Sequence, residues 1–213
     1  MKKNISAGNT LFNEKESFVP PASIYFVIFL LIGFLLFFYF LSFIPISGPS
    51  MENTMYNHQY CLVQRRCFDV KRGDIVTINT AKKGEKDNLI VKRVIGLSGD
   101  CIIFMLSADG YYVDLYIRKA GESHFKLKKE PYIKERMERS SSNYYYANLL
   151  KYDARLTEID FSADYDSSFD KYIITVPKNH IYFMGDNRNI SRDSRYYKTR
   201  SLSCVTSKVL YIF

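Results

Sequence analysis

Three short stretches of the sequence carry side chains that could act together in nucleophilic catalysis. Ser50 lies in Ile46–Thr54 (ISGPSMENT), just past a long uncharged run. Two adjacent cations lie in Leu89–Asp100 (LIVKRVIGLSGD), and a polar loop is predicted at Gly185–Arg195 (GDNRNISRDSR). Because a serine hydroxyl is a weak nucleophile until a neighbouring base takes its proton, the first question is which residue would be that base.

Histidine is the usual base, but the three histidines are not placed for this role. None of His58, His124 and His180 lies in a Gly- and Asp-rich turn that would fix an imidazole, and no serine lies in a GxSxG elbow. We expect all three to be surface or core residues. Lysine can do the same work when it is neutral, and burial among apolar groups lowers its pKa. Lys92, within the apolar stretch Leu89–Ile95, is the candidate base.

Lys92 is followed directly by a second cation, Arg93, and in a strand the two would point to opposite faces. Apolar residues flank each cation on its own face, so periodicity does not say which of the two is buried. Two adjacent charges in an apolar strand are costly, and such costs are found mainly at functional sites. The alternative is an edge strand whose cations reach solvent.

The polar loop near the C-terminus offers supporting side chains. Ser191, Asp193 and Arg195 occupy every second position, which places them on one side of an extended segment. An Asp–Arg pair can make the loop rigid, and the serine hydroxyl is then left to bond an amine. The alternative is an ordinary polar hairpin loop.

The uncharged run is predicted to be a membrane anchor. It covers Ile24–Ile44, 21 residues without a charge, which as a helix would span roughly 30 Å. The run stays rich in Phe and Leu to its end, unlike a cleaved signal sequence, so we expect it to be retained. Lys2, Lys3 and Lys15 precede it, whereas residues 45–64 contain no Lys or Arg. This asymmetry predicts a cytoplasmic N-terminus and an extracytoplasmic domain.

The rest of the chain is predicted to be mostly β, an antiparallel sheet or barrel-like domain. Short runs of β-branched and aromatic residues alternate with turns that contain Gly and Asp. We divide the chain into a cytoplasmic segment at 1–23, the transmembrane anchor at 24–44, a catalytic β core at 45–106 and 171–213, and an inserted, β-rich cap at 107–170. The cap carries clusters of charge, and we assign it no chemistry.

The composition limits other functions. The 213 residues include 30 Lys and Arg against 22 Asp and Glu, a net charge of +8, which indicates a solvated surface and some attraction to anionic lipid. No basic run belongs to a nucleic-acid-binding motif, and no His or Cys spacing suits a metal, so we expect no nucleic acid, metal or cofactor. The cysteines leave two alternatives: Cys61 pairs with Cys67 in an oxidising compartment, or all four thiols stay unpaired.

Four parts of the sequence together resemble the successive boxes of type I signal peptidases, also called leader peptidases. They are Ser50-Met51, Arg72–Val76 (RGDIV), Lys92–Asp100 (KRVIGLSGD) and Gly185–Arg195. Their order, their spacing and the preceding anchor match that family, whereas residues 104–170 resemble only its variable insert. The resemblance implies a membrane-anchored Ser-Lys endopeptidase that releases exported proteins from their signal peptides.

The resemblance also implies roles for individual residues. The catalytic residues would be Ser50, the nucleophile, and Lys92, its general base. The supporting residues would be Ser191, which orients the lysine amine, Asp193 with Arg195, which hold that loop, and Arg93.

The residues around the nucleophile depart in part from the family pattern. Met51 would line the site, but Gly48 stands where some members have a serine that helps to hold the oxyanion. Backbone amides, including that of Ser50, would then have to serve. Asn53 and Ser98 replace prolines of the family, which bears on the rigidity of their loops.

Partners and location follow from the same resemblance. The substrates would be preproteins with small side chains one and three positions before the cut, bound as an added strand. The domain would lie on the outer face of a bacterial cytoplasmic (inner) membrane, in contact with the bilayer and with the export machinery. Two alternatives stay open: a dedicated peptidase of the same clan that matures one substrate, such as a conjugative pilin, and a non-catalytic anchored β domain that binds an export partner. The anchor excludes a soluble autocleaving repressor.

Overall fold

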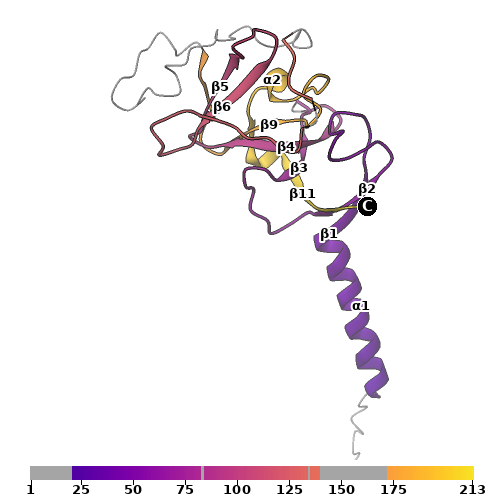
Figure 1. Cartoon of the computed structure of the whole chain (residues 1–213). Helices are drawn as coiled ribbons and strands as arrows, with labels where there is room; N and C mark the ends of the chain where they lie inside the picture. Colours follow the sequence, from indigo (N-terminus) through magenta and orange to yellow (C-terminus); the bar gives the residue numbers. More distant parts are fainter. Residues whose placement is uncertain (1–20, 83, 134, 140–171) are drawn as a thin grey trace, which may run out of the picture. The chain divides into compact units, whose positions relative to one another are not determined.

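The computed structural model describes residues 21–82, 84–133, 135–139 and 172–213, and Figure 1 traces their course. The chain divides into two compact units, one that ends at Phe37 and one that runs from Phe38 to Phe213. The lysines used to predict the orientation, and cap residues 140–170, lie outside the described part of the chain.

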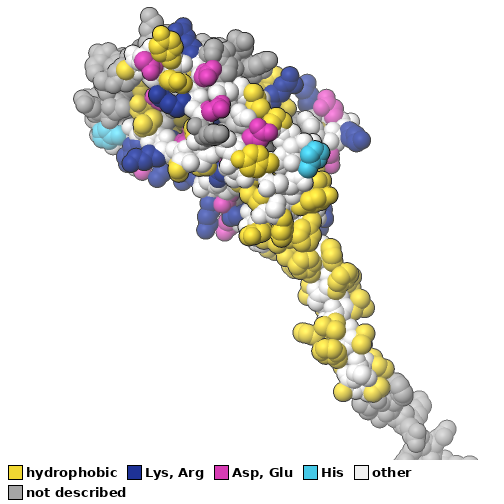
Figure 2. Space-filling view, turned by 45° about the vertical axis from the view of Figure 1, so that its right-hand side comes forward, with side chains coloured by type: hydrophobic (Ala, Val, Ile, Leu, Met, Phe, Trp, Pro, Cys, Tyr) yellow, Lys and Arg dark blue, Asp and Glu magenta, His cyan; other side chains and the backbone are white. Residues whose placement is uncertain are grey.

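The N-terminal helix α1 covers Ala22–Phe40 and is apolar on every side. Its 19 residues include none that is buried, and Figure 2 shows hydrophobic side chains along its visible face. The helix is roughly 28 Å long at its normal rise, and its mean hydropathy of 2.5 makes it a candidate membrane span. It ends before the apolar run of the sequence does, because Leu41–Pro45 pairs with β2 as a strand.

The C-terminal unit is built on a seven-stranded antiparallel sheet with the order β1-β2-β11-β3-β4-β9-β10. Its strands are β1 (Leu41–Pro45), β2 (Tyr60–Gln64), β3 (Ile75–Asn79), β4 (Leu89–Leu97), β9 (His180–Met184), β10 (Arg200–Ser201) and β11 (Val205–Ile212). Ile44 of β1 and Val91 of β4 pack against one core cluster although three strands separate them, so the sheet is curled. The prediction of a mostly β, antiparallel, barrel-like domain behind an apolar helix is confirmed.

A second, four-stranded antiparallel sheet has the order β7-β6-β5-β8. Its strands are β5 (Cys101–Leu106), β6 (Val113–Arg118), β7 (Lys126–Leu127) and β8 (Ile174–Thr175). Strands β6 and β7 belong to the cap, and β5 and β8 flank it in the sequence. Ile95 of β4 and Tyr182 of β9 share a core cluster with Phe104 of β5 and Leu115 of β6. The described part of the cap is therefore packed onto the main sheet.

All four cysteines are unpaired. Cys61 is buried in β2, where burial raises the pKa of its thiol to about 11. Cys67 is exposed in the turn that follows. Of the two alternatives that the sequence left open, the structure shows the one without a disulfide.

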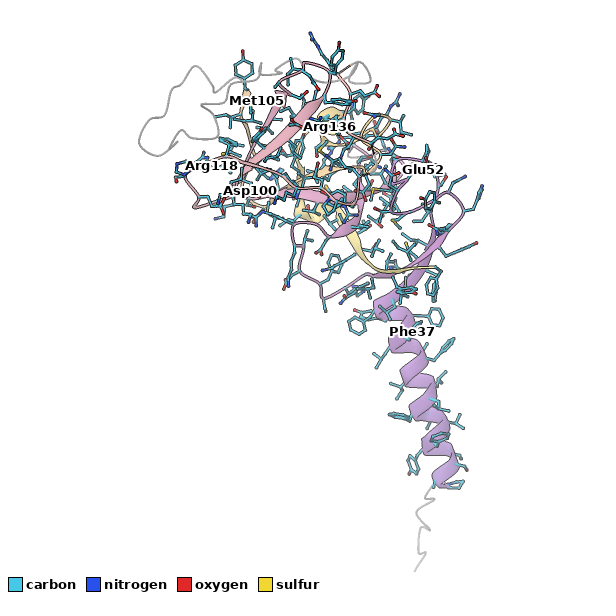
Figure 3. The ribbon with its side chains drawn as sticks, in the orientation of Figure 1. Phe37, Glu52, Asp100, Met105, Arg118 and Arg136 are labelled. Carbon is cyan, nitrogen blue, oxygen red and sulfur yellow. The ribbon has the colours of Figure 1, made fainter. Side chains whose placement is uncertain are left out.

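A buried carboxylate joins the turn before β3 to the turn between β4 and β5 (Figure 3). Asp100 is fully buried, and its oxygens accept hydrogen bonds from Nε and Nη2 of Arg72, both at 2.6 Å. It also accepts from the backbone N–H groups of Leu97 and Ala120. Burial alone would raise the pKa of Asp100, but these donors outweigh burial and hold the pKa below its ordinary value of 3.8.

Replacing Asp100 with alanine should lower the free energy of unfolding by about 3 kcal/mol, because the Arg72 guanidinium and the N–H groups of Leu97 and Ala120 lose their acceptor. Since the folded-state pKa is lowered, this stabilisation is present above about pH 4 and is lost as the pH falls below it. Urea unfolding of the full chain in detergent micelles, followed by circular dichroism, measures both effects. The exposed carboxylate of Asp69 supplies the control Asp69→Ala, and an equal effect of the two substitutions would contradict this account.

Candidate active site

Ser50 lies in the connection between β1 and β2, which hydrogen bonds hold in place. The N–H of Ile46 donates to the carbonyl of Gln59 at 2.8 Å. Gly48 turns the chain with a φ of +88°, which favours glycine, and its N–H donates to Asn57 Oδ1 at 3.0 Å. These contacts fix the backbone that leads into Ser50.

The residue after Ser50 anchors this segment to the core. Met51 and Met55 are 1% and 0% exposed, and they pack in one cluster with Ile46 and Cys61. The N–H of Met55 donates to the carbonyl of Met51 at 2.8 Å, so a helical turn begins directly after the serine. The buried side chains of Met51 and Met55 therefore anchor the segment that carries Ser50 to the core.

Lys92 reaches Ser50 from the middle of β4. It is 3% exposed, and its Nζ lies 2.6 Å from Ser50 Oγ and 2.8 Å from the carbonyl oxygen of Val91. The two side chains come from positions 42 residues apart in the sequence. The curl of the sheet thus brings the predicted nucleophile and the predicted base into hydrogen-bond contact.

Burial lowers the pKa of Lys92 to about 8, because the charged amine loses its hydration. The carboxylates of Asp193 and Asp186 act in the opposite direction, and the guanidinium of Arg195 lowers the pKa further. With such a pKa, about a tenth of the amines are neutral at pH 7. In the neutral form the amine can accept the proton of the Ser50 hydroxyl instead of donating to that oxygen.

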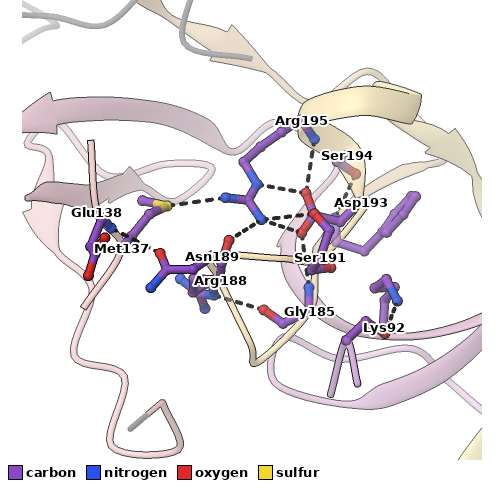
Figure 4. Close-up of polar contacts among 12 residues, drawn as sticks. Lys92, Met137, Glu138, Gly185, Arg188, Asn189, Ser191, Asp193, Ser194 and Arg195 are labelled. Carbon is purple, nitrogen blue, oxygen red and sulfur yellow. Dashed lines mark hydrogen bonds and ion pairs between the residues drawn. The ribbon is translucent and has the colours of Figure 1, made fainter. Parts of the chain in front are cut away.

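Ser191 lies beside the backbone of Ser50 but bonds nothing there. Its Oγ is buried without a hydrogen-bond partner in the described structure, so the predicted bond to Lys92 is not formed. A Cβ added to Gly185 would lie 2.3 Å from both Ser191 Oγ and the carbonyl oxygen of Ser50. Gly185 therefore lets the loop approach Ser50. Figure 4 shows Gly185 beside Ser191. Sequence reasoning missed this role, for which the GDNR motif was the only signal.

Asp193 and Arg195 form the rigid part of the same loop. Asp193 is fully buried and caps helix α2 (Ser194–Tyr197). Its carboxylate accepts from Nε and Nη2 of Arg195, each at 2.8 Å, and from the N–H of Gly185 at 3.1 Å. Nη2 also donates to two carbonyls of the loop (Figure 4). Burial would raise the pKa of Asp193, but Arg195 outweighs burial and the pKa is lowered, so the acid stays charged.

Arg93 points to the opposite face of β4 and pairs with Asp186. Its side chain is 11% exposed, and its Nε and Nη2 lie 2.8 and 2.6 Å from the two carboxylate oxygens. Asp186 also accepts from the hydroxyl of Thr54, in the turn after Ser50. The pair therefore ties β4, the loop after β9 and the Ser50 segment together. Sequence reasoning named Arg93 but missed its acid, whose only signal was its place in the GDNR motif.

A cleft of about 150 Å³ opens beside Ser50 and Lys92. Its lining includes the turn residues Gly48 and Met51, and a larger cavity of about 530 Å³ shares Pro45, Leu89 and Val91 with it. Strand β9 pairs with β4 only from Arg93 onward, so none of the described strands pairs with Leu89–Lys92 on that side. This stretch of β4 can accept an added strand beside Ser50.

Comparison with known proteins finds a family that this chain matches over most of its length. Residues 21–213 match the family model of signal peptidase, peptidase S26. Signal peptidase I P of Bacillus subtilis subsp. natto is 32% identical over 70% of this chain and 64% of its own, so the chain spans less than two thirds of that relative. Signal peptidase I of Streptococcus pneumoniae R6 is 26% identical over 82% of this chain and 83% of its own. A crystal structure of a signal peptidase I from Enterococcus faecalis V583 is similar to this chain with a TM-score of 0.38 and 21% identity, over 68% of this chain and 100% of its own.

The amine of Lys92 should titrate near pH 8, because burial disfavours its charge. The ¹³Cε chemical shifts of labelled lysines in the full chain, followed from about pH 6 to about pH 11, measure this midpoint. The substitution Lys92→Met assigns the resonance, and the exposed lysines of the same sample serve as the reference. A midpoint equal to that of the exposed lysines would contradict the burial of this amine.

Proposed function

The chain belongs to the signal peptidase family, peptidase S26, and on that premise we propose that it is a membrane-anchored serine endopeptidase that cleaves signal peptides from exported preproteins. Ser50 is the nucleophile and Lys92 is its general base. One observation carries this proposal: the 2.6 Å contact between Lys92 Nζ and Ser50 Oγ, made by an amine that is 3% exposed. A non-catalytic binding domain would gain nothing from this contact, because removing an amine from water costs free energy.

The reaction proceeds in two halves. Neutral Lys92 takes the proton of Ser50 Oγ as that oxygen bonds to the scissile carbonyl carbon, whose oxygen gains the negative charge. When the tetrahedral intermediate collapses, the C–N bond breaks and the Lys92 ammonium gives its proton to the leaving amine of the mature protein. Water then attacks the carbonyl carbon of the Ser50 ester and gives a proton to Lys92. The bond from that carbon to Oγ breaks, Lys92 returns the proton to Ser50 Oγ, and the signal peptide leaves as a carboxylic acid. Lysine thus replaces the histidine of the usual serine protease.

The negative oxygen of the intermediate needs hydrogen-bond donors. Gly48 has no side chain that could donate, so we assign this role to the backbone N–H of Ser50, which donates to no other group in the described structure. We assign the orientation of the Lys92 amine to Ser191. Its hydroxyl is buried, unpartnered and next to the Ser50 peptide, and hydrogen bonds at catalytic sites often close only when substrate is bound.

The substrate lies extended along the unpaired part of β4, Leu89–Lys92. Residues one and three positions before the cut then face the same side, because side chains alternate along a strand. The cleft of about 150 Å³ beside Ser50 has room for a small side chain at the first of these positions. The larger cavity, which continues along Leu89 and Val91, is open to the second.

Helix α1 and the family together support a single-pass membrane protein. We assign the N-terminus to the cytoplasm and the C-terminal unit to the outer face of the cytoplasmic (inner) membrane, from the distribution of cations around the anchor. An anchored enzyme meets membrane-bound signal peptides where they leave the bilayer. Contact with the export machinery stays a prediction of the family resemblance.

The full chain in lipid vesicles should cleave a preprotein, and Ser50→Ala and Lys92→Met should each lower the rate by roughly a thousand-fold or more. Mass spectrometry of the products measures cleavage, and circular dichroism checks the fold. Lys71→Met and Ser203→Ala, at exposed side chains away from the cleft, are the matched controls.

Cleavage by Lys92→Met at the wild-type rate would contradict the assignment of the base. If the wild-type chain cleaves no preprotein, the non-catalytic anchored β domain becomes the better hypothesis. A panel of preproteins tested beside a single conjugative pilin separates a general from a dedicated peptidase.

Gly185→Ala should lower kcat by roughly 100-fold, because the new Cβ would overlap Ser191 Oγ and the Ser50 carbonyl and would push the loop from the nucleophile. The same cleavage assay measures this loss. Gly33→Ala, where the added Cβ meets open space, is the control. A wild-type kcat for Gly185→Ala would show that this close packing is not needed.

A further inference from the structure

A buried ion pair joins the cap to the loop after β9. The side chains of Arg188 and Glu130 are 1% and 6% exposed. Both terminal nitrogens of the guanidinium donate to the carboxylate, Nη2 to Oε1 at 2.6 Å and Nη1 to Oε2. The reaction described above gives neither residue a role. Because desolvating two charges offsets much of their attraction, a buried pair is weak evidence of stabilisation, and a functional role is worth seeking.

The third guanidinium nitrogen of Arg188, Nε, reaches the loop beside Ser50. It donates to the carbonyl of Gly185 at 2.9 Å, while the N–H of Gly185 donates to Asp193. Gly185 is therefore held from both sides at the point where it touches Ser50 and Ser191. A guanidinium that makes a bidentate pair with a carboxylate has a fixed orientation, so the direction of its third hydrogen bond is fixed as well.

Tyr132 links the same carboxylate to a second arginine. Its hydroxyl donates to Glu130 Oε1 at 2.6 Å, and the guanidinium of Arg93 lies 4.1 Å above its ring. Burial, together with Glu130, raises the pKa of Tyr132, so the hydroxyl stays protonated and remains a donor. One short segment of the cap thus contacts both Arg93, the partner of Asp186, and the arginine that holds Gly185.

We propose that Glu130 and Tyr132 are positioning residues for Ser50 and Lys92, acting through the two arginines. The inference rests on the function proposed above. By fixing Gly185, they hold the backbone beside the nucleophile at the separation that the lysine contact requires. A misplacement of about 1 Å at such a point can cost about 100-fold in rate. The cap, to which the sequence assigned no chemistry, then belongs to the catalytic apparatus.

The first test compares Glu130→Gln and Tyr132→Phe with the wild type, in the reconstituted full chain and with a fluorogenic signal-peptide substrate. Positioning predicts that kcat falls roughly 10- to 100-fold for Glu130→Gln and roughly threefold to tenfold for Tyr132→Phe, while KM changes less than about threefold. Because both residues act through one set of contacts, the double variant should be little worse than Glu130→Gln.

The matched control is Glu122→Gln, at a cap carboxylate whose ion-pair partners are the exposed Lys119 and Lys126. It should keep the wild-type kcat. A covalent acylating inhibitor counts the reactive Ser50 in each sample, so that misfolded enzyme does not enter kcat. If kcat per reactive site is unchanged in Glu130→Gln and Tyr132→Phe while the unfolding temperature falls, the pair only stabilises the fold and the proposal is overturned. Tyr132→Phe keeps the ion pair and decides the question if Glu130→Gln does not fold.

A second readout does not require peptidase activity. The N–H groups of Gly185 and Asn187 donate to Asp193 and to the Ser50 carbonyl. Their hydrogen exchange should speed up roughly tenfold in Tyr132→Phe and stay unchanged in Glu122→Gln. If the wild type cleaves nothing, the proposed function fails and the exchange rates alone decide the positioning role. Unchanged exchange in Tyr132→Phe would then overturn it.

Discussion

The site depends on burying the amine of Lys92 without placing an unpaired carboxylate beside it. Burial lowers the pKa of Lys92 from 10.5 to about 8, a difference of about 3 kcal/mol between its two protonation states. Asp193 and Asp186 both raise the pKa of this amine, but each carboxylate is already paired with an arginine, Asp193 with Arg195 and Asp186 with Arg93. If either acid faced the lysine unpaired, it would stabilise the ammonium and raise the pKa of Lys92, and fewer of the amines would be neutral near pH 7.

The fold meets this requirement by convergence of segments that are distant in the sequence. The curled sheet carries Lys92 to the connection that holds Ser50, and buried methionines keep that connection in place. The loop after β9 closes the site from another side because Gly185 leaves room for it. The cap in turn holds this loop through Arg188. Rigid positioning, more than any single strong bond, is what such a site needs.

The apolar helix, the mostly β fold and the candidate residues Ser50 and Lys92 could be predicted from the sequence, because each depends on residue type and local spacing. The rest depends on long-range pairing. Hydropathy did not reveal that the apolar run passes from helix to strand after Phe40, since that change is set by pairing with β2. The alternation of side chains along β4 predicted two apolar faces and did not say which cation would form an ion pair. The position of Asp186 in the folded chain decides that Arg93 does. Glu130 meets its partner 58 residues away, from a stretch without a recognised motif.

Trapping the covalent intermediate is the most direct test of the pairing of Ser50 with Lys92. The full chain is mixed with a peptide ester at a series of pH values, quenched with acid, digested and mapped by mass spectrometry. We expect an acyl group on Ser50 alone, formed at a rate that rises with pH through a midpoint near 8 and that vanishes when Lys92 lacks its amine. An acyl group on another side chain, or a rate indifferent to the loss of that amine, would contradict this pairing.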